Sequence, residues 1–326
     1  MKKKILITGG TGFIGYHLAK KCIRMGWEVT SLSKRKPNSI RTLKKVKYLT
    51  GDLTKKKDLR VLKKKFDYVV NAAGVVDHSA DKNVFKAHYL GCKNLANFFL
   101  KKKIKLFLQI GSCVEYGSQK SPQKENFKSK ITGLKSMYSK GKFAASQYLM
   151  KLHKSYKFPV IILRLYLNYG PNQDFNRFLP VIIDGCIRNK KFPCSSGIQY
   201  RSFTYVDDLV RAIIIALKKP QLSGNIFNIG NNKPVKIKKI IQYIRKKINK
   251  GAPLYGKVKF RKDEIKRLYP NISKAKLLLN WQPKISIEKG VKNLLSIIHR
   301  WKDAPVWTPK SIKEETRTWF KLLEKN

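Results

Sequence analysis

The sequence predicts an α/β protein with a doubly wound parallel sheet and a second, smaller lobe. Over the first two-thirds of the 326 residues, short apolar segments alternate with segments of helical periodicity, which is the pattern of successive βαβ units. A glycine-rich turn joins the first apolar segment to the first helical one. The right-handed crossovers of such a sheet place a ligand at the carboxyl ends of the strands.

The predicted strands are short and apolar, and they are residues 4–8, 28–32, 46–49, 68–72, 106–110 and 160–165. The predicted helices between them repeat apolar residues every three or four positions, and they are residues 13–25, 83–101 and 136–154. Further along, residues 207–218 predict a helix and residues 225–229 a strand, and we expect both to return to the main sheet.

The charge of the chain is strongly positive, with 72 Lys plus Arg against 19 Asp plus Glu, or +53. Such a balance is typical of proteins that bind nucleic acid or anionic membranes. However, 58 of the bases are Lys and only 14 are Arg, whereas phosphate and base recognition depends on Arg forks. The lysines are spread along the whole chain, so a solvated surface and no nucleic-acid partner is the favoured interpretation.

Five cysteines, an odd number without the spacing of a zinc or redox site, indicate a reducing compartment, and we expect no metal. The apolar run after Met1 ends at Gly9 and is too short for a signal peptide. No segment approaches the roughly 18 apolar residues of a membrane span. These features predict a cytoplasmic protein without a membrane partner.

A dinucleotide site is indicated by Gly9, Gly12 and Gly15, which lie between the first strand and the first helix. Glycines there let the backbone turn tightly and let a pyrophosphate reach the helix N-terminus, where free N–H groups bind it. Residues 1–170 are therefore expected to form a Rossmann dinucleotide-binding domain, joined by 203–230.

The remaining segments are richer in prolines and turns. Residues 171–202 and 231–300 are predicted to form the substrate-binding lobe. Residues 301–326 carry three of the five tryptophans, and we expect them to dock on the rest of the protein as a C-terminal extension.

The end of the second strand predicts the cofactor. NAD enzymes normally carry an acidic residue there, which binds the adenosine ribose 2′-hydroxyl. This chain has Ser33, followed by Lys34 and Arg35. A hydroxyl and two cations suit a 2′-phosphate that a carboxylate would repel. We therefore expect NADP, with NAD as the alternative.

A series of further motifs follows in a characteristic order. They are residues 9–15, 51–53, 71–74, 112–117, 138 with 142, 168–171, 201–208, 228–230, 273–275 and 281–283. Together they resemble the extended short-chain dehydrogenase/reductases that modify nucleotide sugars, the epimerase/dehydratase group. The resemblance covers about residues 3–298. It implies a nucleoside-diphosphate sugar as substrate and a homodimer formed through helices 83–101 and 136–154.

The catalytic residues are expected to be Ser112, Tyr138 and Lys142. The spacing Tyr-x-x-x-Lys occurs six times, but only Tyr138 lies on a predicted helix about 25 residues after a Ser that ends a strand. One helical turn places Tyr138 and Lys142 on the same face. An adjacent ammonium is expected to lower the phenol pKa, and Lys142 can hold the nicotinamide ribose. Ser112 would hydrogen-bond the reacting sugar oxygen.

The resemblance also implies roles at single positions. Asp52 matches an adenine contact, and Ala73 lies on the loop beneath the cofactor. Asn168 matches a substrate-side asparagine, Arg201 a diphosphate-binding arginine, and Arg261 a second one. The remaining residues implied to contact the cofactor are Phe13, Ile14, Leu53, Ala72 and Gly74.

Departures from the family pattern argue against a 4,6-dehydratase and against a decarboxylase. Cys113 and Val114 replace the Asp-Glu pair of 4,6-dehydratases, and the related decarboxylases also carry Glu at the second position. His88 stands in place of Asn, Gly141 in place of Ser, and Ser202 in place of Asp.

The favoured function is hydride transfer from NADPH to C4 of a nucleoside-diphosphate 4-keto sugar, with Tyr138 as general acid. The first alternative is a C4 epimerase with retained NAD. The second is an RNA-binding or regulatory relative without activity, although the chain keeps the Tyr, Lys and glycine pattern.

Overall fold

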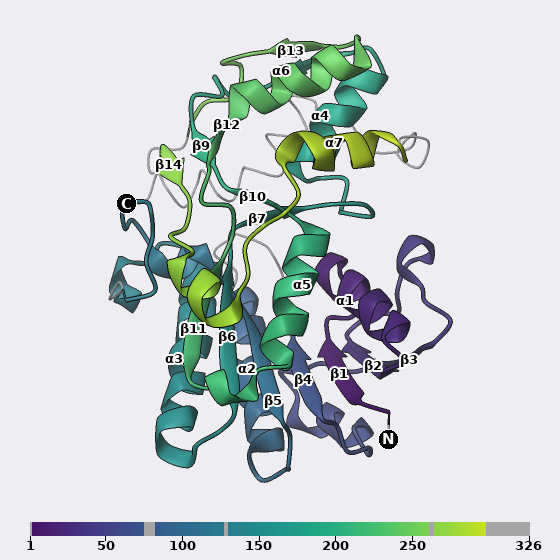
Figure 1. The fold of residues 1–326 in the computed structure, drawn as a ribbon, viewed down its shortest axis with the longest axis vertical. Helices are drawn as coiled ribbons and strands as arrows, with labels where there is room; N and C mark the ends of the chain where they lie inside the picture. Colours follow the sequence, from purple (N-terminus) through teal and green to yellow (C-terminus); the bar gives the residue numbers. More distant parts are fainter. Residues whose placement is uncertain (1, 75–81, 127–129, 261–263, 298–326) are drawn as a thin grey trace.

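The computed structural model describes residues 2–74, 82–126, 130–260 and 264–297. Its centre is a parallel sheet with the strand order β11-β6-β5-β4-β1-β2-β3 (Figure 1). The strands are β1 (Lys4–Thr8), β2 (Glu28–Ser33), β3 (Val46–Thr50), β4 (Tyr68–Asn71), β5 (Leu106–Ser112), β6 (Val160–Leu165) and β11 (Asn225–Ile229). The order reverses beside β1, and a crevice for a ligand forms at this position of a doubly wound sheet. The predicted fold class is confirmed.

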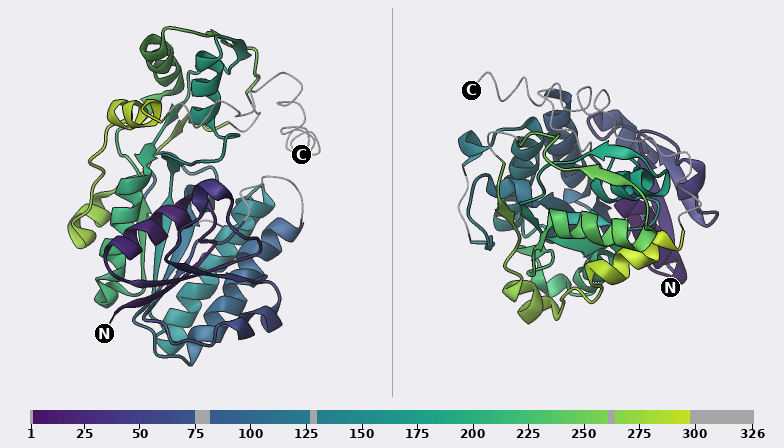
Figure 2. Two further views of the ribbon diagram at one scale, coloured as in Figure 1. Left: turned by 90° about the vertical axis from the view of Figure 1, so that its right-hand side faces the viewer. Right: turned by 90° about the horizontal axis from the view of Figure 1, so that it is seen from above.

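Helices cover both faces of the sheet because its strands are apolar on both sides. On one face, α1 (Phe13–Arg24) packs against α5 (Val206–Leu217), and on the other α2 (Lys82–Leu100) packs against α3 (Met137–Tyr156) (Figure 2). Alternate residues of β1 enter the two cores: Ile5 and Ile7 belong to one hydrophobic cluster, and Leu6 belongs to the other. The sheet is thus buried between two apolar layers.

The smaller lobe lies beyond the carboxyl ends of the strands (Figure 1). Its described residues contain the α-helices α4 (Phe178–Ile187), α6 (Ile237–Ile248) and α7 (Ile287–Leu295). Short strands form three small sheets: β7 (Leu167–Tyr169) with β10 (Phe203–Tyr205); β9 (Tyr200–Arg201) with β12 (Val235–Lys236) and β14 (Arg267–Leu268); and β8 (Lys191–Pro193) with β13 (Ala252–Leu254). After β10 the chain enters α5 and β11, and β11 pairs with β6 at the edge of the main sheet.

The sequence patterns did not predict the three lobe helices. In α4, Pro180 interrupts an apolar segment, but it is the third helical residue. A proline is tolerated in the first turn because its N–H would have no helical acceptor there. The expected C-terminal extension, residues 301–326, lies outside the described residues. No helix in the described part of the chain is long and apolar enough to cross a membrane.

Candidate active site at the carboxyl ends of the strands

The glycine loop makes a tight turn between β1 and α1. The Gly9 N–H donates to Leu32 O at 2.9 Å, and the Gly12 N–H donates to Gly9 O at 2.9 Å. Gly9 has a φ of +70°, and a Cβ on Gly15 would lie 2.3 Å from Gly9 O. Only glycine fits these positions without a backbone shift. Phe13 and Ile14 begin α1, so the first-turn N–H groups of this helix face the loop.

A pocket of about 310 Å³ lies beside the end of β2, where the sequence predicts the adenosine of the cofactor. Its lining residues are Thr11, Arg35, Lys36, Pro37, Thr42, Tyr48, Leu49 and Thr50. Lys34 is not among them, because its Nζ pairs with Asp52 Oδ2 at 2.9 Å. Sequence reasoning did not identify Lys36. At the end of β2, Ser33 is buried, and its hydroxyl has no hydrogen-bond partner among the described residues.

Asp52 and Leu53 follow β3 and are held by hydrogen bonds. Partial burial acts to raise the pKa of Asp52, but hydrogen bonds from Thr54 and the Lys34 ammonium outweigh it, and the pKa is lowered. The Leu53 carbonyl accepts from Asn94 Nδ2 of α2 at 2.9 Å. Asp52 is thus a carboxylate at neutral pH and lies two residues beyond the end of β3.

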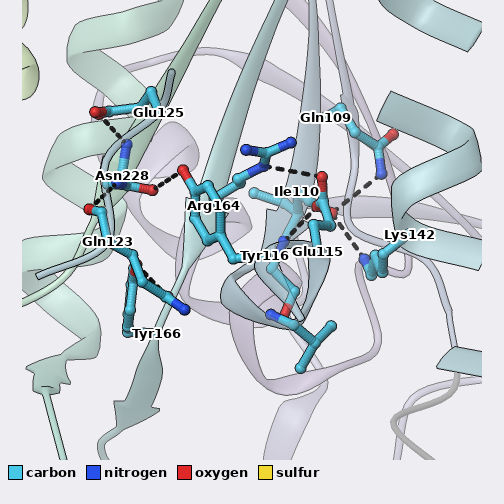
Figure 3. A network of polar contacts seen from close by, with 12 residues as sticks. Gln109, Ile110, Glu115, Tyr116, Gln123, Glu125, Lys142, Arg164, Tyr166 and Asn228 are labelled. Carbon is cyan, nitrogen blue, oxygen red and sulfur yellow. Dashed lines mark hydrogen bonds and ion pairs between the residues drawn. The ribbon is translucent and has the colours of Figure 1, made fainter. Parts of the chain in front are cut away.

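A chain of buried polar groups crosses the sheet below the loop formed by Ala72, Ala73 and Gly74. Thr8 Oγ1 donates to Asn71 Oδ1 at 2.6 Å, and Asn71 Nδ2 donates to Gln109 Oε1 at 2.8 Å. The Ile110 carbonyl then accepts from Gln109 Nε2 at 3.0 Å and from Lys142 Nζ at 2.7 Å (Figure 3). The chain therefore links the end of β1 to the predicted catalytic lysine.

The structure brings Ser112, Tyr138 and Lys142 together. Ser112 is the last residue of β5, and the N-cap Ser136 starts α3, so that Tyr138 lies in its first turn and Lys142 one turn later. The Ser112 hydroxyl and the Tyr138 phenol share a hydrogen bond. Lys142 Nζ lies 6.0 Å from the centroid of the Tyr138 ring. All three side chains are at least nine-tenths buried.

The expected lowering of the Tyr138 pKa by Lys142 is wrong for this structure. Burial raises the pKa of Tyr138 to about 12, although the hydrogen bond with Ser112 acts in the opposite direction. Burial also lowers the pKa of Lys142 to about 8, opposed by the charge of Glu115. The Lys142 ammonium donates to a backbone carbonyl instead of the phenol, so it does not compensate the desolvation of the phenolate.

Two departures from the family pattern prove to be in contact. His88 of α2 is buried, and its ring meets the Tyr138 ring edge-on, with centroids 5.0 Å apart. A Cβ on Gly141 would lie 3.0 Å from His88 Cβ, and a Cβ on Gly74 would lie 2.0 Å from the imidazole. The two glycines therefore leave room for the histidine beneath Tyr138.

The predicted substrate residues lie on the small sheets. Asn168 Nδ2 donates to Tyr166 O at 2.8 Å, whereas Asn168 Oδ1 is buried without a hydrogen-bond partner in the described part of the chain. The Arg201 guanidinium pairs with Glu264 and donates to Ile265 O at 2.7 Å. Burial raises the pKa of the Cys113 thiol to about 12, and the charge of Arg201 acts in the opposite direction, so Arg201 lies on the same side of the structure as the residue after Ser112. Arg261, the second expected diphosphate arginine, falls outside the described residues.

Comparison with known proteins leads to the same family as these motifs. Residues 5–230 match the model of the NAD dependent epimerase/dehydratase family. The chain belongs to this family. It is thus an enzyme of a family whose members are nucleotide-sugar epimerases and dehydratases, as the motif order indicated.

Several characterised members of the NAD dependent epimerase/dehydratase family are similar along nearly their whole length. The UDP-glucuronate 4-epimerase of Thermodesulfobacterium geofontis is 27% identical over 331 residues, covering 94% of this chain and 98% of that protein. The human dTDP-D-glucose 4,6-dehydratase is 28% identical over 328 residues, covering 92% of this chain and 92% of that protein. A Bacillus cereus UDP-glucuronic acid 4-epimerase variant, solved with a substrate analogue and NAD, superposes with a TM-score of 0.82 at 25% identity, covering 91% and 99%.

The residues present fit the dinucleotide that this family uses. Gly15 lets the first turn of α1 pack closely on the backbone of Gly9, and the pocket that Arg35 lines includes Thr11 of the glycine loop. Ser33 at the end of β2, two residues before Arg35, has a buried hydroxyl without a hydrogen-bond partner among the described residues. Ser112, with which Tyr138 shares a hydrogen bond, ends β5, two strands away from β1 in the sheet.

The signal that sequence reasoning missed is at Glu115. Ser112 and Glu115 have the spacing of a capping box, Ser-x-x-Glu, directly after a strand. In the structure this glutamate is fully buried behind Ser112 and pairs with Arg164 of β6 at 2.9 Å (Figure 3). The sequence did not predict that Glu115 and Arg164 form an ion pair, because the two residues lie 49 positions apart.

Proposed function

We propose that this enzyme is a reductase that transfers hydride from NADPH to C4 of a nucleoside-diphosphate 4-keto sugar. The observation that carries the proposal is the state of Tyr138, which is buried, hydrogen-bonded to Ser112 and has a pKa raised to about 12. Such a phenol is protonated at neutral pH and acts as a general acid. An epimerase must also remove a proton from the sugar hydroxyl, which this environment disfavours.

The chain's own residues act on the ketone as follows. Ser112 donates its hydroxyl hydrogen to the C4 oxygen and orients the carbonyl, and Tyr138 delivers its proton to the same oxygen as negative charge develops. Lys142, anchored on Ile110 O, holds the nicotinamide ribose with its remaining N–H groups. The bound dinucleotide supplies the hydride.

Two features support NADPH over NADH. Arg35 and Lys36 line the adenosine pocket, and of the described residues that line it none is acidic. A 2′-phosphate would therefore meet two cations, one of them an arginine suited to bidentate contact. Lys34 contributes less, because its ammonium is paired with Asp52.

The substrate side is supported by Asn168 and Arg201. The buried Asn168 Oδ1 and Thr204 Oγ1, both unpartnered among the described residues, lie on strands paired in register at these two positions. Arg201 would bind the diphosphate once its guanidinium exchanges Glu264 for phosphate oxygens.

A C4 epimerase with retained NAD is the second candidate, because the similar proteins include a 4-epimerase and a structure that holds NAD. The test is direct. The purified protein is denatured, its supernatant is analysed for nucleotides, and turnover is measured with UDP-, GDP-, CDP- and dTDP-linked sugars, with and without added NADPH or NADH.

We expect no copurified NAD, NADPH consumption with a 4-keto sugar, and loss of turnover in Tyr138→Phe. Turnover without added cofactor, together with tightly bound NAD, would refute the reductase proposal in favour of the epimerase.

A further inference from the structure

A buried ion pair lies directly behind the catalytic serine. Glu115 belongs to η3 (Cys113–Tyr116), the short helix that follows β5, and is fully buried. Its Oε1 accepts from the Ser112 N–H at 2.8 Å, and its Oε2 accepts from Arg164 Nε at 2.9 Å (Figure 3). Arg164 lies on β6 and is itself only 3% exposed. One carboxylate thus connects the backbone of Ser112 to the neighbouring strand.

The surroundings hold this pair in one conformation. Gly111, the register partner of Arg164, leaves the space for it: a Cβ there would lie 2.7 Å from Glu115 Oε1 and 3.3 Å from Arg164 Cγ. The Arg164 guanidinium lies over the Tyr116 ring, 4.4 Å from its centroid. The Tyr116 hydroxyl in turn donates to Asn228 Oδ1 of β11 at 2.7 Å.

Neither helix capping nor stability explains the charges. A capping box is formed by Gln as well as by Glu. Burial of two charges is costly, and an apolar pair of similar volume is often equally or more stable. The charged groups of this pair therefore have a reason other than stability.

The site supplies a reason, because Tyr138 and Lys142 both form hydrogen bonds with the end of β5, Tyr138 with Ser112 and Lys142 with Ile110. Lys142 Nζ is anchored on the carbonyl of Ile110, two residues before Ser112 on β5. Among the described groups that influence the pKa of Lys142, Glu115 acts from η3 and Cys92 from α2, and both raise it against burial. Burial raises the pKa of the Cys92 thiol to about 12, so at neutral pH only Glu115 is charged. Tyr138 lies beside Lys142 on α3 and is neutral as well.

We infer that Glu115 and Arg164 are positioning residues, which fix Ser112 at the end of β5 so that its hydroxyl meets Tyr138 and the substrate oxygen. The negative charge of Glu115 also opposes the effect of burial on the pKa of Lys142. This inference rests on the proposed function, since both residues act through Ser112 and Lys142.

Two double variants separate the parts of this inference. Glu115→Gln with Arg164→Met removes both charges and retains an oxygen that accepts from the Ser112 N–H. Glu115→Leu with Arg164→Met removes that acceptor as well. Both keep the volume of the pair and leave no unpaired buried charge, so both are expected to fold. The matched control is Asp184→Asn with Arg188→Met, which removes a partly buried ion pair between α4 and its C-cap residue.

The readouts are kcat, KM for the nucleotide sugar, and the pH dependence of kcat. In both variants we expect the high-pH limb to move down by about one pH unit, because Lys142 loses the negative charge of Glu115, which opposes the effect of burial on its pKa. In the Leu variant kcat also falls roughly ten- to hundredfold with KM nearly unchanged, because Ser112 is misplaced. The control changes neither.

Two results would overturn the inference: a Leu variant with the wild-type kcat and pH profile, or an effect confined to KM or Tm. In either case the wild-type enzyme still turns over, and the proposed function stands. If the wild-type protein turned over no nucleotide sugar at all, the proposed function would fail first, and this inference with it.

Discussion

Replacing Lys142 by Met is expected to stabilise the protein while abolishing its activity. Burial lowers the pKa of this ammonium from 10.5 to about 8. A native pKa below the unfolded value means that the charged form is less favourable in the native state. The difference corresponds to about 3 kcal/mol of lost stability wherever both states are protonated, that is, below about pH 8. The methionine variant escapes this cost.

The sign of the pH dependence follows from the same difference. Between about pH 8 and 10.5 the native protein releases the Lys142 proton while the unfolded chain keeps it, so wild-type stability rises with pH at about 1.4 kcal/mol per pH unit. The gain from Lys142→Met should therefore be largest near pH 7 and shrink towards pH 10. Loss of the hydrogen bond from Lys142 Nζ to Ile110 O leaves no unsatisfied buried carbonyl, because Ile110 O still accepts from Gln109 Nε2.

The assay is urea unfolding of both proteins at pH 7.0 and 9.5. Lys151→Met is the matched control: it removes an exposed ammonium from the same helix and should change the stability little at either pH. A Lys142→Met variant that is less stable than wild type at pH 7, or whose gain does not depend on pH, would refute the reasoning.

Three further predictions concern the cofactor and partners. Gly15→Ala places a Cβ 2.3 Å from Gly9 O. It should lower the free energy of unfolding in urea by about 2–4 kcal/mol and abolish dinucleotide binding. Gly133→Ala is the control and should be neutral, because its added Cβ would have no neighbouring atom within 4 Å. Arg35→Ala should weaken NADPH roughly ten- to hundredfold in calorimetry and change NADH less than twofold; equal losses would contradict a 2′-phosphate contact. Generic RNA should bind weakly at physiological salt, and tight binding that persists there would support an RNA-binding role.

Sequence patterns predicted the main sheet well because each of its strands is buried on both faces. Such strands are continuous apolar runs separated by helical periodicity, and β6 (Val160–Leu165) has the bounds that its apolar run predicts. The lobe was harder. Its strands are two or three residues long, and strands such as β9 and β14 depend on pairing with distant segments. No local pattern reports such pairing.

The site shows the same division between local and distant information. The spacing of Tyr138 and Lys142 predicted that they share a face, since one helical turn separates them. The sequence did not predict that Lys36 lines the pocket and Lys34 does not. Lys34 pairs with Asp52, which follows β3, and this distant contact is not visible in the local sequence. The raised pKa of Tyr138 likewise depends on burial by several elements, which neighbouring residues in the sequence do not report.

The contact between His88 and Gly141 changes how departures from a family pattern should be weighed. In the sequence they are two unrelated substitutions, 53 positions apart, near catalytic residues. In the structure the imidazole lies against Tyr138, and a side chain at position 141 would press on its Cβ. A larger residue on α2 therefore requires a smaller one on α3. The pair is one change in the packing beneath Tyr138, and it leaves the hydrogen bond between Tyr138 and Ser112 in place.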